Sequence, residues 1–123
     1  MNLFLIAAAV LSAGVFLIHT FLGGRTIAVP LLKSGDLHPV PKYVAYYCWH
    51  LVTIVLAAIA VMFAVAGVRA QSLDLAWVAT ALTALFCLLG LAVPPIKKQK
   101  YGDMPQGWLF LPIFLLGTLG GVT

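Results

Sequence analysis

Long apolar runs are the feature of this chain that most restricts its fold. Three of them cover residues 3–22, 44–68 and 73–93, or 20, 25 and 21 residues. An α-helix rises 1.5 Å per residue, so about 20 apolar residues cross the ~30 Å hydrocarbon core of a bilayer. A fourth run, 108–122, is shorter, and we expect its helix to begin near Pro105. The sequence therefore predicts an all-α fold: one integral membrane four-helix bundle over residues 1–123, with spans at 3–22, 44–68, 73–93 and 105–122.

Composition narrows the class of function. Hydrophobic residues make up 63% of the chain and charged residues 8%, with a mean hydropathy of +1.12. A soluble domain of this size has too little interior to bury so much apolar surface, so the lipid bilayer is the expected partner. The three acids are all Asp, which disfavours carboxylate-bridged di-iron chemistry because that chemistry needs several Glu residues. No Ser or Cys stands with a His and a carboxylate in a recognisable arrangement, so we expect no catalytic residue.

The positive charges predict an orientation. Six of the seven Lys and Arg residues fall in two expected loops, 23–42 and 94–107, and these are Arg25, Lys33, Lys42, Lys97, Lys98 and Lys100. The connection 69–72 carries only Arg69. Since the positively charged side is cytoplasmic, both termini are expected outside (N-out/C-out). This topology accounts for the net charge of +4 without a nucleic-acid partner. Within the loop 23–42, Pro30, Pro39 and Pro41 are expected to break any longer helix.

Two histidines lie inside neighbouring apolar runs and suggest a site. A histidine within a membrane span is costly and normally faces a partner, a cavity or a ligand. Counting from the span ends places His19 and His50 at similar depth in the cytoplasmic leaflet. Helical spacing puts Tyr46, Tyr47 and Thr53 on the face of the second span that carries His50. We therefore expect a polar intramembrane site around the two imidazoles.

Three interpretations of this site remain open. In the first, His19 and His50 are the axial metal ligands of a haem b, with Arg25 or Lys42 pairing with its propionates. In the second, the site holds a quinone, a lipid headgroup, or a copper or zinc ion. The aromatic residues Tyr46, Tyr47 and Trp49 are also typical of an interfacial belt.

In the third interpretation the protein is a non-catalytic structural or accessory subunit whose histidines make only packing hydrogen bonds. Pairs of small residues such as Gly117 and Gly121 are compatible with contacts inside the chain, in a homo-oligomer or in a larger membrane complex. The cofactor thus stays unknown, with haem b as the leading candidate.

Several short motifs resemble those of a family of small four-span bacterial inner-membrane proteins described as uncharacterised. The residues concerned are 19–23 (HTFLG), 30–32 (PLL), 49–53 (WHLVT) and 105–110 (PQGWLF). The usual pattern of that family is H-[ST]-x-L-G-E, W-H-x-x-T and P-x-W-x-L-F. The resemblance implies a multi-pass protein of the bacterial inner (cytoplasmic) membrane and carries over His19, Trp49, His50 and Thr53 without a reaction. This chain departs from the pattern at Gly24, where the family often has Glu.

Overall fold

The computed structural model describes all 123 residues and contains helices without strands. Its elements are α1 (Leu3–Leu17), the π-helix η1 (Ile18–Ala28), α2 (Val29–Lys33), α3 (Pro39–Val68), the 3₁₀-helix η2 (Ala70–Ser72), α4 (Leu73–Ile96) and α5 (Gln106–Val122). The predicted all-α fold is confirmed. Three continuous helices, Leu3–Lys33, Pro39–Val68 and Ala70–Ile96, are long and apolar enough to cross a membrane. The fourth, α5, has 17 residues.

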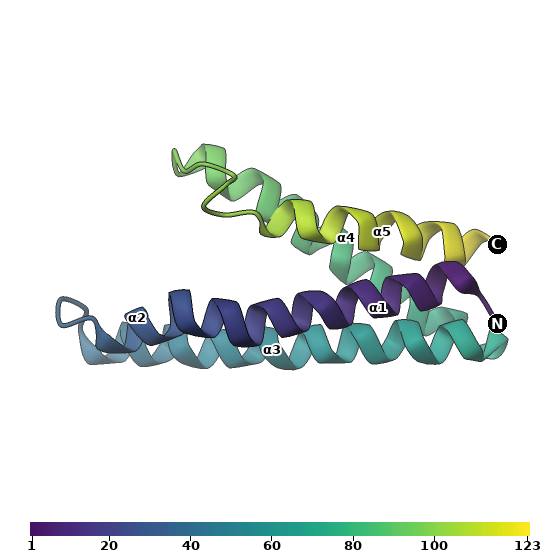
Figure 1. Cartoon of the computed structure of the whole chain (residues 1–123), viewed down its shortest axis with the longest axis horizontal. Coiled ribbons are helices and arrows are strands. Elements are labelled where there is room, and N and C mark those ends of the chain that lie inside the picture. The colour runs from purple at the N-terminus through teal and green to yellow at the C-terminus, as the bar shows by residue number, and fades with distance from the viewer.

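The helices form two antiparallel hairpins (Figure 1). One hairpin pairs α1, η1 and α2 with α3, and the other pairs α4 with α5. The two hairpins contact each other at the end that carries both chain termini, which we call the terminal end (Figure 1). They diverge toward the opposite end, the loop end, where the connections 34–38 and 97–105 lie.

The prediction of a loop over residues 23–42 is wrong, because only residues 34–38 of that segment lie outside helices. The prolines explain the difference. Pro39 and Pro41 occupy the first turn of α3, where backbone N–H groups have no intrahelical acceptor and a missing donor costs nothing. The first bond of that helix runs from the Lys42 N–H to the His38 carbonyl at 3.2 Å. Pro30 lies within the continuous helix, directly after the π-helix. We attribute the fact that it does not break the helix to the wider π-helical turn that precedes its ring.

The π-helix η1 begins one residue before His19. Its backbone has five-residue spacing, and the Val29 N–H donates to the Gly24 carbonyl. Two hydroxyls of this segment bond carbonyls four residues back, since Thr20 donates to Phe16 at 2.8 Å and Thr26 donates to Leu22 at 2.9 Å. Threonines in α3, α4 and α5 make the same bond, so these bonds alone do not account for the π-helix.

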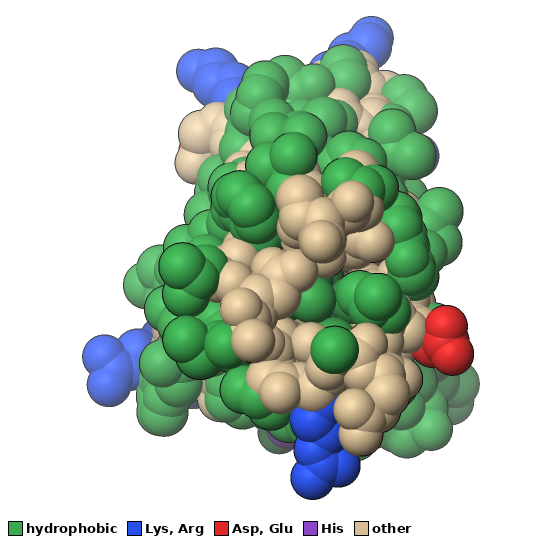
Figure 2. Space-filling view, turned by 90° about the vertical axis from the view of Figure 1, so that its right-hand side faces the viewer, with side chains coloured by type: hydrophobic (Ala, Val, Ile, Leu, Met, Phe, Trp, Pro, Cys, Tyr) green, Lys and Arg blue, Asp and Glu red, His purple; other side chains and the backbone are tan.

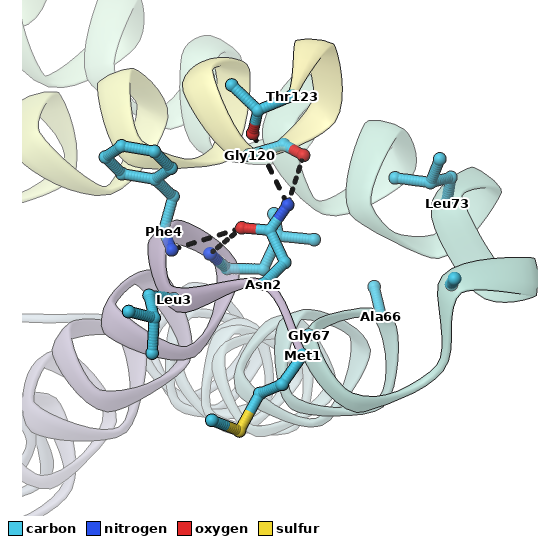
Figure 3. Close-up of a pocket in the computed structure, with 11 residues that line it drawn as sticks. Met1, Asn2, Leu3, Phe4, Ala66, Gly67, Leu73, Gly120 and Thr123 are labelled. Atoms are coloured by element: carbon cyan, nitrogen blue, oxygen red, sulfur yellow. Dashed lines mark hydrogen bonds between the residues drawn. The ribbon is translucent and has the colours of Figure 1, made fainter.

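Asn2 joins three helices at the terminal end (Figure 3). Its side-chain oxygen accepts hydrogen bonds from the backbone N–H groups of Phe4 and Leu5 at 3.1 and 3.2 Å, and so caps α1. Its side-chain N–H donates to the Gly120 carbonyl of α5 at 2.8 Å. Its backbone N–H donates to the Gly67 carbonyl of α3 at 2.8 Å. One residue thereby links the first hairpin to α5 of the second by hydrogen bonds.

Substitution of Asn2 separates these roles. Asn2→Ala removes the helix cap and the donor to Gly120, and we expect a loss of about 1–3 kcal/mol from the two contributions together. Asn2→Asp keeps the cap but cannot donate, so we expect a smaller loss of about 1 kcal/mol. Reversible unfolding in detergent measures both. An Asn2→Asp variant as stable as the wild-type protein would show that the bond to Gly120 contributes nothing, and equal stability of the two variants would show the same of the cap.

Small residues make the close helix contacts. A Cβ added at Gly117 would meet the Thr80 hydroxyl and, at 2.9 Å, the Phe63 ring. A Cβ at Gly121 would lie 2.8 Å from the Trp77 ring. The Gly117 and Gly121 pair therefore packs inside the chain, against α3 and α4.

The outer surface is apolar along the helices. Leu85, Leu88 and Leu89 of α4 are 61%, 64% and 62% exposed, which is costly in water and favourable in lipid. Figure 2 shows the molecule from the terminal end, where hydrophobic side chains surround a centre of backbone and polar groups and charged side chains appear only at the rim. The surface thus suits a bilayer environment.

Candidate functional site

His19 lies on η1 and stacks against Trp49 of α3. The two ring centroids are 3.9 Å apart, and the ring planes differ by 16°. Gly23, one turn further along η1, makes room for this arrangement, because a Cβ there would lie 2.6 Å from Cη2 of Trp49. The imidazole is half-buried between the two helices of the first hairpin.

Thr53, one turn further along α3 from Trp49, completes a small polar cluster. Nε2 of His19 is 3.1 Å from the Thr53 hydroxyl oxygen and 3.3 Å from the Trp49 carbonyl oxygen. The same hydroxyl donates to that carbonyl at 3.1 Å. The predicted association of His19 with Thr53 is therefore present in the structure, and the cluster orients the imidazole.

A cavity of about 310 Å³ opens beside this cluster, between the two hairpins. Its inner wall is apolar and includes Val15, Leu56 and Phe110, whereas Thr26, Asp103 and Gln106 contribute polar groups. His19, Gly23 and Trp49 also line it. Residues from three of the motifs quoted above, 19–23, 49–53 and 105–110, thus meet at one cavity although they are far apart in the sequence.

His50 lines a different cavity, of about 260 Å³, together with Tyr46, Thr20, Gly24 and Thr53. Its ring stands edge-on to Tyr46, with centroids 4.6 Å apart and planes at 87°. The side chain is exposed and makes no hydrogen bond within the chain. Trp49 borders both cavities, so the two imidazoles do not face one shared space.

The remaining candidate residues lie outside both cavities. Tyr47 is 63% exposed and Arg25 is also exposed, and neither lines a cavity. No three His, Cys, Asp or Glu side chains are grouped as a metal site would require. Of the predicted set, the structure brings His19 together with Thr53, and separately brings His50 together with Tyr46.

Residue patterns alone did not assign Trp49, Asp103 or Gln106 to the larger cavity. The residue pattern at Trp49 is typical of an interfacial belt, and only the family resemblance carried it over, although it lies four residues before Thr53 and therefore on the same helix face. Asp103 lies just before the fourth span, and Gln106 lies in the 105–110 motif without a role of its own. Nothing in their local sequence indicates that the second hairpin brings them opposite His19.

No protein-family model matches this chain, and no curated protein or solved structure is significantly similar to it.

Proposed function

We propose that this chain is a four-span protein of a bacterial inner membrane that binds a small membrane-dissolved ligand beside His19, between its two hairpins. The observation that carries the proposal is the 310 Å³ cavity, which combines an apolar wall with a few polar groups. Small-molecule sites typically have this lining and start at about 300 Å³. A ligand with a compact polar head and an apolar body matches both properties.

The depth of the cavity supports a ligand that enters from the bilayer. The 30 residues of α3 extend about 45 Å, longer than a hydrocarbon core of about 30 Å. Counting about 20 residues back from Val68 reaches Trp49, which sets the headgroup level near that residue. The polar groups of the cavity then lie at the headgroups, and its apolar wall lies in the hydrocarbon.

Charge supports the orientation. The loop end carries Arg25, Lys33, Lys42, Lys97, Lys98 and Lys100, whereas the terminal end carries Arg69. With the positive end cytoplasmic, both termini are outside and the cavity opens in the cytoplasmic leaflet.

A haem held between His19 and His50 fits less well. Axial ligation by two imidazoles needs both rings to face one macrocycle, and Trp49 lies between the two cavities that these residues line. We therefore prefer an organic ligand that contacts His19 alone.

Mass spectrometry of the protein in lipid nanodiscs tests the proposal. Wild-type protein is expected to retain a bound small molecule, whereas Val52→Trp narrows the cavity and should reduce its occupancy at least ten-fold. Leu88→Trp, on the lipid-facing side of α4, is the matched control and should leave the occupancy unchanged.

Two outcomes would contradict the proposal. A haem absorption band in the same sample would replace the organic ligand with haem. A colourless wild-type protein that retains no molecule, and takes up none from a lipid extract, would favour the accessory-subunit alternative. That alternative has one supporting observation, the hydrogen bonds of His19 to Thr53 and to the Trp49 carbonyl, which join η1 to α3 as packing bonds would.

A further inference from the structure

The surroundings of His19 favour one ring nitrogen as the site of the proton in the neutral form. The Trp49 carbonyl only accepts, and the Thr53 hydroxyl already donates to it at 3.1 Å. Nε2 lies 3.1 Å from that hydroxyl oxygen and 3.3 Å from the carbonyl oxygen. An unprotonated Nε2 would place its lone pair against the carbonyl lone pairs, so Nε2 carries the hydrogen and donates.

Nδ1 is therefore left with a lone pair. It has no hydrogen-bond partner within the chain, and His19 lines the larger cavity. In the other tautomer, Nε2 could accept only if the Thr53 hydroxyl hydrogen turned away from the Trp49 carbonyl, and that carbonyl would then lose both of its side-chain donors. The imidazole is thus an oriented hydrogen-bond acceptor.

Two further groups at the cavity accept rather than donate. The hydroxyl hydrogen of Thr26 is used in the bond to the Leu22 carbonyl, which leaves only its oxygen lone pairs. Asp103 contributes a carboxylate, which is an acceptor. Gln106 contributes an amide, which both donates and accepts, and Trp49 has one donor, its indole N–H. Acceptors are in the majority around His19.

We infer that the ligand head carries a hydrogen-bond donor, a hydroxyl or a protonated amine, which donates to Nδ1 of His19 while the apolar body lies between the hairpins. This inference rests on the proposed ligand site and adds the chemistry of the ligand to it. A head with acceptors only, such as a quinone, would leave Nδ1 without a partner and would face the Asp103 carboxylate.

Two matched pairs of probes test the inference on the full chain in nanodiscs. A short-chain hydroquinone and its dimethyl ether differ in their hydroxyl donors. Decylammonium and decyltrimethylammonium share a charge and differ in N–H donors. In at least one pair, the donor-bearing member is expected to bind wild-type protein about ten-fold more tightly. The pair that shows the preference identifies the head as a hydroxyl or an amine.

His19→Phe is the informative variant, because a phenyl ring can stack on Trp49 but has no acceptor. The ten-fold preference should disappear in this variant, whereas His50→Phe should retain it. Long-range ¹H–¹⁵N correlation of the His19 ring provides a direct check, with the hydrogen expected on Nε2.

The outcomes separate the two proposals. If a probe binds and Val52→Trp abolishes its binding, but wild-type protein shows no donor preference, the site stands and the donor inference is overturned. A hydrogen found on Nδ1 would overturn it as well. If no probe and no quinone binds wild-type protein, the proposed ligand site itself fails.

Discussion

Alkaline phosphatase fused after Thr123 is expected to be active in bacterial cells, whereas the same enzyme inserted at Gly35 is expected to be at least ten-fold less active. The phosphatase requires export for activity, and the proposed orientation, based on the positive charges, has the C-terminus outside and the connection 34–38 in the cytoplasm. The effect is large because a fusion is either exported or retained. Activity per unit of fusion protein, measured in intact cells, is the readout.

Two additional insertion points control for effects of the fusion itself. An insertion at Gln71, in the connection between the hairpins, should match the active C-terminal fusion, because both lie at the terminal end. An insertion at Gly102 should match the inactive one, because it lies at the loop end. The reverse pattern at all four points would invert the topology and move the cavity to the outer leaflet.

Gly107→Ala is expected to destabilise the protein by about 3 kcal/mol, at the upper end of the usual cost of overpacking. A Cβ at this position would lie 2.6 Å from both the Gly90 carbonyl carbon and the Leu91 nitrogen. These are backbone atoms of α4, so no flexible side chain can move aside and α5 must shift as a whole. Gln106 and Phe110 would move with it, so ligand binding should weaken too.

Gly14→Ala is the matched control for this prediction. The position is helical, and nothing lies within 4 Å of the added Cβ. Alanine favours a helix over glycine by about 1 kcal/mol, so this variant should be neutral or slightly stabilised. Reversible unfolding in the same detergent compares the two variants. A Gly107→Ala protein as stable as Gly14→Ala would show that α4 and α5 are less closely packed than described.

The helical fold could be predicted from the sequence, because the length of an apolar run indicates the length of a membrane helix. The helix boundaries at the loop end could not be predicted, since proline breaks a helix in its interior but is tolerated in its first turn, where Pro39 and Pro41 lie. Pro30 was misleading for another reason. It follows a π-helix, which the apolar pattern does not indicate.

Only part of the candidate site could be predicted from the sequence. Helix-face reasoning grouped Thr53 with the histidines, and the structure places it beside His19. The same reasoning predicted one shared site for His50 and His19. That prediction depends on how each helix of the first hairpin is rotated about its own axis, which the sequence does not show. The π-helix makes this harder, because it changes the angle between successive residues in the segment that contains His19. The contribution of Asp103 and Gln106 depends on tertiary packing alone.

The uneven distribution of close contacts along the two hairpins has a mechanical consequence. Asn2, Gly67 and Gly120 connect α1, α3 and α5 at the terminal end, whereas the hairpins diverge at the loop end. A pair of stiff rods joined at one end changes its separation most at the other. In the proposed orientation, lateral pressure in the cytoplasmic leaflet is therefore expected to change the volume of the cavity.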